Sequence, residues 1–119
     1  MVTWFEAHCR SQKLASAARA PLSRGDEPTA QDLFAQAAAA EEQALQQISP
    51  DRPTTLGVIA LSASALWIKA KRVEDAARVA RLLLRMPALL PLAQSHLTAV
   101  NAALRGANKA LIPVPALAC

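Results

Sequence analysis

The side chains that most often act in catalysis or metal binding are few in this chain, and they are not spaced for either task. His8 and Cys9 are adjacent, so on a helix they point about 100° apart and do not converge on one metal ion. His96 directly follows Ser95, but adjacency does not make a catalytic dyad, and the glycine-flanked serine of hydrolases is missing. The paired-cysteine and His-Glu-x-x-His spacings of zinc sites are also missing. We therefore expect no enzymatic activity, no cofactor and no metal.

Two polar side chains fall inside apolar helical faces. Glu41 lies within the apolar face of a helix predicted from residue 29 to about residue 48, where an unpaired buried carboxylate is costly. We interpret Glu41 as half of a structural ion pair with a basic residue of a neighbouring helix. A catalytic acid is less favoured, because the sequence places no second acid, His or nucleophile beside it. We interpret His96 as a hydrogen-bonded core histidine, so an enzyme that uses Glu41 or His96 is the least favoured hypothesis.

A group of basic side chains, which we call the basic ridge, is the candidate partner-binding surface. The basic ridge comprises Lys69, Lys71, Arg72, Arg78, Arg81 and Arg85. The last three recur along one side of a predicted helix, and guanidinium groups bind carboxylates and phosphates through paired hydrogen bonds. The simpler interpretation is a solvated helix face on which Glu74 pairs with Arg78. Nucleic acid is the less favoured partner, because aromatic side chains for stacking on bases are scarce.

Composition predicts one small helical domain. The chain has 119 residues, 53% of them hydrophobic but only 3% aromatic, and alanine and leucine, both strong helix formers, predominate. The net charge of +4 is uneven: residues 60–119 carry eight basic and two acidic side chains, and residues 1–59 carry five and seven. This asymmetry is compatible with an acidic partner on the second half. The alanine content also fits a GC-rich bacterial genome.

Cysteine use and hydropathy favour a cytoplasmic protein. Cys9 and Cys119 stand near opposite ends of the sequence, with neither the number nor the spacing of a disulfide framework, which fits a reducing compartment. The N-terminus lacks the apolar core of a secretory signal. The longest uncharged stretch, residues 86–104, is interrupted by prolines and polar side chains, so we expect no membrane span.

Start and stop signals predict about four to five helices. Thr3 and Glu6 form a capping box for a first helix that reaches about residue 20, and residues 21–28 have loop composition. We expect residues 1–28 to be an N-terminal extension, weakly docked or mobile; a transit peptide is a less favoured alternative. Thr29, with Asp32, caps the second helix, and Thr54 or Thr55 caps the third. The remaining helices are predicted over about 74–86 and 91–105, so the folded domain spans residues 29–106 and residues 107–119 form an irregular tail.

Residues 60–87, ALSASALWIKAKRVEDAARVARLLLRMP, resemble a tetratricopeptide repeat. Small Ser64, aromatic Trp67, small Ala80 and the closing Pro87 follow the large-and-small order of that family. The chain departs from the pattern at Ala60, where a large aromatic is usual, and it lacks the glycine expected near residue 71. The resemblance implies antiparallel helical hairpins in a right-handed stack. From about residue 31 to residue 104 the chain is also similar to a group of short bacterial helical proteins, which implies no function.

The resemblance implies protein–protein interaction. The leading hypothesis is therefore a non-enzymatic scaffold or adaptor module that binds an unknown partner protein or self-associates through a groove or apolar helix face. The alternative hypothesis is electrostatic binding of nucleic acid or another acidic partner by the basic ridge.

Overall fold

The chain folds into antiparallel helices packed side by side. The structure is a computed structural model, and it describes residues 2–83, 85, 91 and 119. The helices are α1 (Trp4–Ala17), the short α2 (Arg19–Ser23), α3 (Glu27–Gln46), α4 (Pro53–Lys69) and α5 (Val73–Leu83). The described residues form no strand. The all-α class is therefore as predicted, whereas the right-handed tetratricopeptide-like stack stays a prediction.

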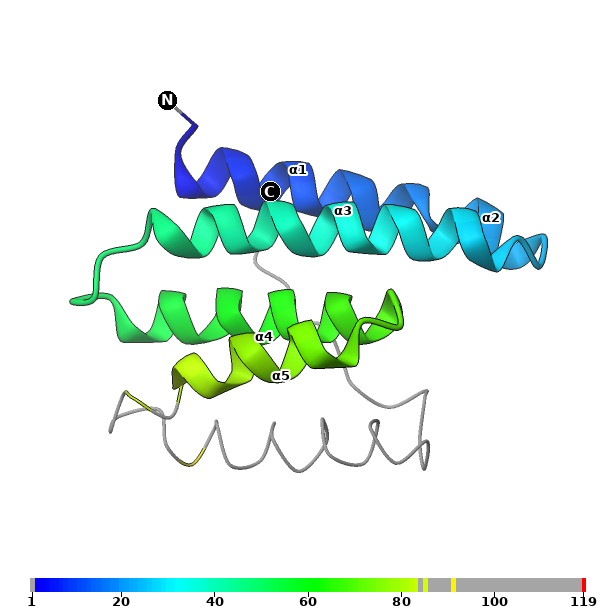
Figure 1. Cartoon of the computed structure of the whole chain (residues 1–119). Coiled ribbons are helices and arrows are strands. Elements are labelled where there is room, and N and C mark those ends of the chain that lie inside the picture. Colours follow the sequence, from blue (N-terminus) through cyan, green and yellow to red (C-terminus); the bar gives the residue numbers. More distant parts are fainter. Residues whose placement is uncertain (1, 84, 86–90, 92–118) are drawn as a thin grey trace.

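Helix α3 lies between its two neighbours in the fold. It packs against α1 on one side and α4 on the other, and α5 packs against α4 (Figure 1). Short connections turn the chain back on itself between α3 and α4 and between α4 and α5, which makes these pairs antiparallel. The predicted fifth helix with His96, and residues 107–118 of the predicted tail, lie outside the described residues.

The N-terminal segment differs most from the sequence prediction. Residues 1–28 were expected to be weakly docked or mobile, but α1 lies along α3 and buries Ala7, His8 and Ser11. The buried positions of α1 carry small or polar side chains, so the sequence of this helix shows little of the apolar periodicity that indicates a packed face. Residues 19–23, partly expected as loop, form α2; Pro21 is compatible with this because first-turn N–H groups have no intrahelical partner.

Helix starts also differ in detail. Thr3 caps α1 as predicted, accepting a hydrogen bond from the Glu6 N–H at 3.2 Å. Asp26, and not Thr29, caps α3: its carboxylate accepts from the Thr29 N–H at 3.3 Å, and Pro28 occupies the first turn. Helix α4 begins at Pro53, one residue before the predicted threonines, because proline has the backbone angle that a first turn requires.

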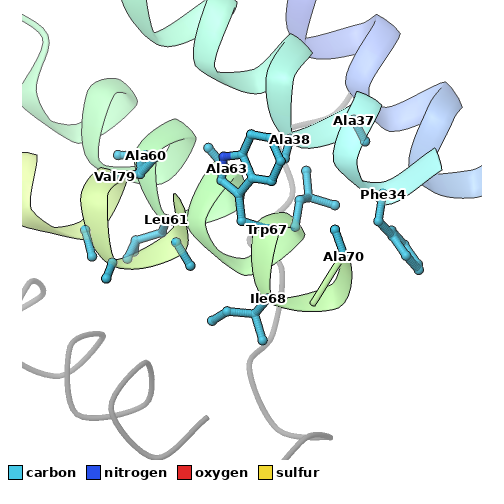
Figure 2. Packing of buried hydrophobic residues seen from close by; sticks show 14 of the residues in the cluster. Phe34, Ala37, Ala38, Ala60, Leu61, Ala63, Trp67, Ile68, Ala70 and Val79 are labelled. Atoms are coloured by element: carbon cyan, nitrogen blue, oxygen red, sulfur yellow. The ribbon is translucent and has the colours of Figure 1, made fainter. Parts of the chain in front are cut away.

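The main core forms where α3, α4 and α5 meet. Trp67 of α4 is the largest side chain there, and Figure 2 shows it facing Ala37 and Ala38 of α3. Small alanines allow the helices to approach closely around this one large ring. Helix α4 is buried continuously from Ile59 to Ile68 and is therefore the central element of the fold.

Two turns end their helices in the same way. Gly25, after α2, has φ of 77°, and Lys71, after α4, has φ of 63°. After α4 the N–H of Arg72 donates to the Trp67 carbonyl at 2.8 Å, and the N–H of Lys71 donates to the Ile68 carbonyl at 2.9 Å. This pair of bonds is the Schellman motif, which favours glycine at the left-handed position. The second turn has lysine there instead.

Candidate functional site

A polar cluster is buried where α1, α3 and α4 meet. His8, Glu41 and Ser62 come from these three helices in turn, and each is 0% exposed. His8 Nδ1 lies 2.9 Å from Glu41 Oε1 and 3.1 Å from Oε2, and Ser62 Oγ donates to Oε2 at 2.6 Å. The structure thus places Glu41 against a histidine of α1, whereas the sequence suggested only some basic residue of a neighbouring helix.

Burial dominates the electrostatics of this cluster. Desolvation raises the pKa of the Glu41 carboxyl above its ordinary value, although the hydrogen bonds from Ser62 and His8 oppose the rise. Glu41 therefore takes up a proton more readily than an exposed glutamate does. Ser11, one turn after His8, has a buried hydroxyl without a hydrogen-bond partner in the described part of the chain.

The order of the three side chains decides what the cluster can do chemically. In a nucleophilic triad the histidine lies between the serine and the acid, so that it can take the serine proton. Here the carboxyl group of Glu41 lies between Ser62 and His8, and the Ser62 hydroxyl donates to that carboxyl group and not to the histidine. All three side chains are closed off from solvent. The arrangement fixes the register of three helices.

A second network surrounds Glu42. Trp67 Nε1 donates to Glu42 Oε2 at 2.6 Å, and the Arg78 guanidinium donates to both Glu42 oxygens at 2.7 and 2.8 Å. Arg78 also reaches Asp75 at 3.3 Å. These hydrogen bonds, Glu42 foremost, raise the pKa of Arg78 above its ordinary value. Glu42 thereby joins α3 to α4 and α5.

The basic ridge is divided by these contacts. Arg78 is engaged by Glu42 and Asp75, not by the predicted Glu74. Arg72 lies 5.1 Å from the centre of the Trp67 ring and bridges to Asp75 at 2.8 Å. The Lys69 ammonium lies 5.7 Å from the centre of the Phe34 ring. The structure thus does not bring the six side chains together as one open surface.

Three members of the ridge are less constrained. Lys71, Arg81 and Arg85 are exposed, and within the described residues they form no ion pair. Lys71 is at the turn between α4 and α5, whereas Arg81 and Arg85 are toward the other end of α5. The free positive charge is therefore split between two places.

A groove opens beside the turn between α4 and α5. It holds a volume of about 240 Å³ between the start of α3 and the end of α4. Its apolar lining consists of Leu22, Ala30, Phe34, Ile68 and Val73, and its polar edge consists of Glu27, Gln31, Lys69 and Lys71. Leu22 is 51% exposed, which makes it the most exposed large apolar side chain in the described part of the chain. We call this feature the α3–α4 groove.

Other site types find no support in the described residues. Among them, no three His, Cys, Asp or Glu side chains are grouped as a metal site requires. None of the helices in the described ranges has both the length and the apolar character of a membrane-crossing segment. Comparison of the chain with protein-family models, with curated proteins and with solved structures gives no match.

Three parts of the site were not predicted from the sequence. Sequence reasoning singled out Glu41 because an acid inside an apolar face is conspicuous, but it gave no reason to choose His8 or Ser62 as partners. It missed Glu42 entirely, because Trp67 and Arg78 are far away in the sequence. Nothing in the sequence indicated the groove, because its lining residues come from α2 and the start of α3 and, about 40 residues later, from the end of α4 and the turn that follows.

Proposed function

We propose that this chain is a non-enzymatic interaction module, a scaffold or adaptor that binds a short segment of a partner protein in the α3–α4 groove. The partner segment inserts one or two large apolar side chains and carries an acidic residue beside them. The observation that carries the proposal is an apolar groove, with an exposed leucine on its wall, edged by two lysines. The resemblance to tetratricopeptide repeats points to the same class of function.

The size of the groove favours a side chain over a small molecule. Sites for drug-sized ligands and cofactors have volumes of about 300–1,000 Å³. The α3–α4 groove, at about 240 Å³, lies below that range and is open along one side. Leucine and phenylalanine anchors of protein segments fill hollows of this kind, and they supply most of the binding free energy.

The charged side chains at the edge of the groove favour an acidic residue in the partner segment. Lys69 and Lys71 line the groove from the end of α4 and the turn that follows, and Glu27 lines it from the start of α3. An acidic residue next to the apolar anchor lies toward the two lysines, and a basic or neutral residue lies toward Glu27. Such complementarity favours one orientation of the bound segment.

The polar cluster supports the non-enzymatic part of the proposal. A substrate has no access to His8, Glu41 or Ser62, because each is fully buried. The Ser62 hydroxyl also donates to the Glu41 carboxyl group and not to a histidine, as a nucleophilic triad would require. A structural role explains both features without a reaction.

The test is selection of a phage-displayed library of random 12-residue peptides on the intact protein. We expect the selected peptides to share Leu, Ile or Phe next to Asp or Glu. Binding of synthetic versions, followed by fluorescence anisotropy, is expected to weaken about tenfold or more in Leu22→Asp, because a buried apolar contact becomes a carboxylate. The matched control is Leu82→Asp, which changes another leucine that is 39% exposed and lies outside the groove.

The outcomes separate the candidate functions. Equal loss of binding in both leucine variants, or peptides without an apolar and acidic pattern, contradicts the groove proposal. Binding of a labelled 20-nucleotide strand that falls steeply with salt, and that is lost in Arg81→Glu with Arg85→Glu, establishes the electrostatic alternative. A dimer in light scattering that dissociates on Leu22→Asp identifies a second copy of the chain as the occupant.

A further inference from the structure

An aromatic side chain is exposed at the beginning of α1. Phe5 is 44% exposed, and the nearby Val2 is exposed as well. The Phe5 ring makes an edge-to-face contact with Trp4, with the two ring centres 5.6 Å apart. Trp4 in turn packs against a small apolar cluster that includes Ile48 and Ile59. Phe5 is therefore presented to solvent on a base that is anchored in the fold.

Two charged side chains of opposite sign accompany Phe5. Glu6 is the next residue along α1, and its carboxylate accepts a hydrogen bond from the Thr3 hydroxyl at 3.1 Å. The Arg52 guanidinium lies 5.5 Å from the centre of the Trp4 ring. The apolar and charged side chains of this region are all exposed, and we call them the N-terminal patch: Val2, Phe5, Glu6 and Arg52.

The α3–α4 groove has features complementary to those of the N-terminal patch. Its lining is apolar, with Lys69 and Lys71 at the end of α4 and the turn that follows, and Glu27 at the start of α3. The groove is proposed to accept a large apolar residue next to an acid, and Phe5 followed by Glu6 is such a pair. The arginine of the patch supplies the charge opposite to that of Glu27. The two surfaces therefore match in apolar character and in both signs of charge.

The N-terminal patch lies too far from the groove to occupy it within one molecule. Trp4, which supports the patch, packs beside Ala44 near the end of α3, whereas Ala30 at the start of α3 lines the groove. Between Ala30 and Ala44 the helix rises by about 21 Å, at 1.5 Å per residue. Figure 1 likewise shows the beginning of α1 and the turn between α4 and α5 at opposite ends of the fold. Only another molecule can bring the two surfaces together.

We propose that the N-terminal patch of one copy of this chain binds in the α3–α4 groove of a second copy. The inference rests on the proposed function of the groove and names the partner. Phe5 enters the groove beside Leu22, and Glu6 lies toward the two lysines. The two surfaces in contact differ, so each pair of copies still has one free groove and one free patch. Copies therefore add head to tail, and the assemblies grow with concentration.

The test is sedimentation velocity of the intact protein at concentrations up to about 1 mM. We expect the average sedimentation coefficient of the parent protein to rise with concentration. Phe5→Asp alters the patch and Leu22→Asp alters the groove, and each should weaken association about tenfold or more, because a carboxylate replaces a buried apolar contact. Leu82→Asp is the matched control, since this exposed leucine lies outside both surfaces, and it should associate as the parent does.

A mixture of the two variants tests the head-to-tail contact directly. Phe5→Asp retains an intact groove, and Leu22→Asp retains an intact patch, so an equimolar mixture has one compatible contact. We expect the mixture to form a heterodimer with one copy of each variant, which does not grow further, at concentrations where each variant alone is monomeric. Formation of the heterodimer also shows that both variants are folded, and circular dichroism of each variant checks this independently.

Two results overturn the inference while the proposed function stands. One is a parent protein that stays monomeric at the highest concentration although its groove binds the selected peptides, which means that the occupant is a different protein. The other is association that persists in Phe5→Asp alone, which means that the copies meet through another surface. Failure of the groove itself is recognised separately, because Phe5→Asp should bind the selected peptides as tightly as the parent does. Loss of peptide binding to the parent overturns both proposals.

Discussion

Glu41 and Glu42 are neighbours in the sequence with opposite surroundings. Glu41 turns toward α1 and α4 and is fully buried with His8 and Ser62. Glu42 turns toward α4 and α5 and binds Trp67 and Arg78 at the edge of the core. One position along a helix rotates a side chain by about 100°, so two adjacent acids join α3 to α1, α4 and α5.

The buried carboxyl predicts a specific pH dependence. The pKa of Glu41 is higher in the folded protein than in the unfolded chain, so its protonated form favours folding. That contribution is fully present below the unfolded pKa of about 4.5 and is lost as the pH rises through the higher folded value. Relative to Glu41→Gln, which stays neutral, the parent protein should therefore lose free energy of unfolding as the pH rises above about 4.5.

Urea denaturation of both proteins from pH 4 to pH 7 measures this difference. Groups that titrate alike in the two proteins cancel in the subtraction, and His8 is the titratable side chain in direct contact with Glu41. Repeating the comparison in His8→Asn removes its contribution. A difference that changes in the opposite direction, with the parent gaining stability as the pH rises, means that the pair is ionised, and it contradicts the neutral carboxyl.

At the scale of elements, the turn between α4 and α5 is an unusual feature. Lys71 occupies a left-handed conformation that costs an L-residue roughly 1–2 kcal/mol and costs glycine little. The resemblance to tetratricopeptide repeats had noted that a glycine was missing near this position. The hydrogen bonds of the Schellman motif hold the conformation in spite of the side chain.

Lys71→Gly should therefore stabilise the protein. Glycine removes the conformational cost of the left-handed position from the folded state, but it also adds conformational entropy to the unfolded chain. The first effect is the larger of the two, so we expect the free energy of unfolding to rise by about 0.5–1 kcal/mol. Gly25→Ala is the matched control, because the same motif has glycine there and an added Cβ meets nothing within 4 Å. This variant should lose about 1 kcal/mol for conformational reasons alone. Chemical denaturation measures both, and equal signs for the two variants would falsify the argument.

The sequence predicted which segments form helices better than it predicted where the helices end or which side chains meet between them. Periodicity and the Thr3 capping box located α1, and proline and alanine patterns located α3 and α4 within a few residues. The cap of α3 was misplaced because Asp26 and Thr29 are both good caps, and only the position of Pro28 decides between them. Contacts such as Trp67 with Glu42 depend on how helices rotate against each other, which no local pattern specifies.

At the scale of the whole molecule, α1 packs as part of the folded domain. A short polar helix near one end suggests an optional extension, yet His8 supplies a buried partner to Glu41. Ala7 also packs with Ala44 of α3 and Ile59 of α4 in a small apolar cluster separate from the main core. Removing α1 would leave the Glu41 carboxyl facing water on one side and Ala44 uncovered. The domain that the sequence placed at residues 29–106 therefore needs the preceding helix to complete its packing.

Hydrogen exchange followed by mass spectrometry tests this integration in the intact protein. If α1 belongs to the folded unit, the amides of residues 8–14 should exchange through the same cooperative opening as those of residues 59–66 in α4, with similar protection. Weakening the contact by His8→Ala should lower the protection of both segments together, because it leaves Glu41 without one of its hydrogen bonds. The control is Arg10→Ala, an exposed position on the same helix, which should leave both segments unchanged. Exchange of α1 within seconds, beside a protected α4, would instead mean that α1 opens separately from the core.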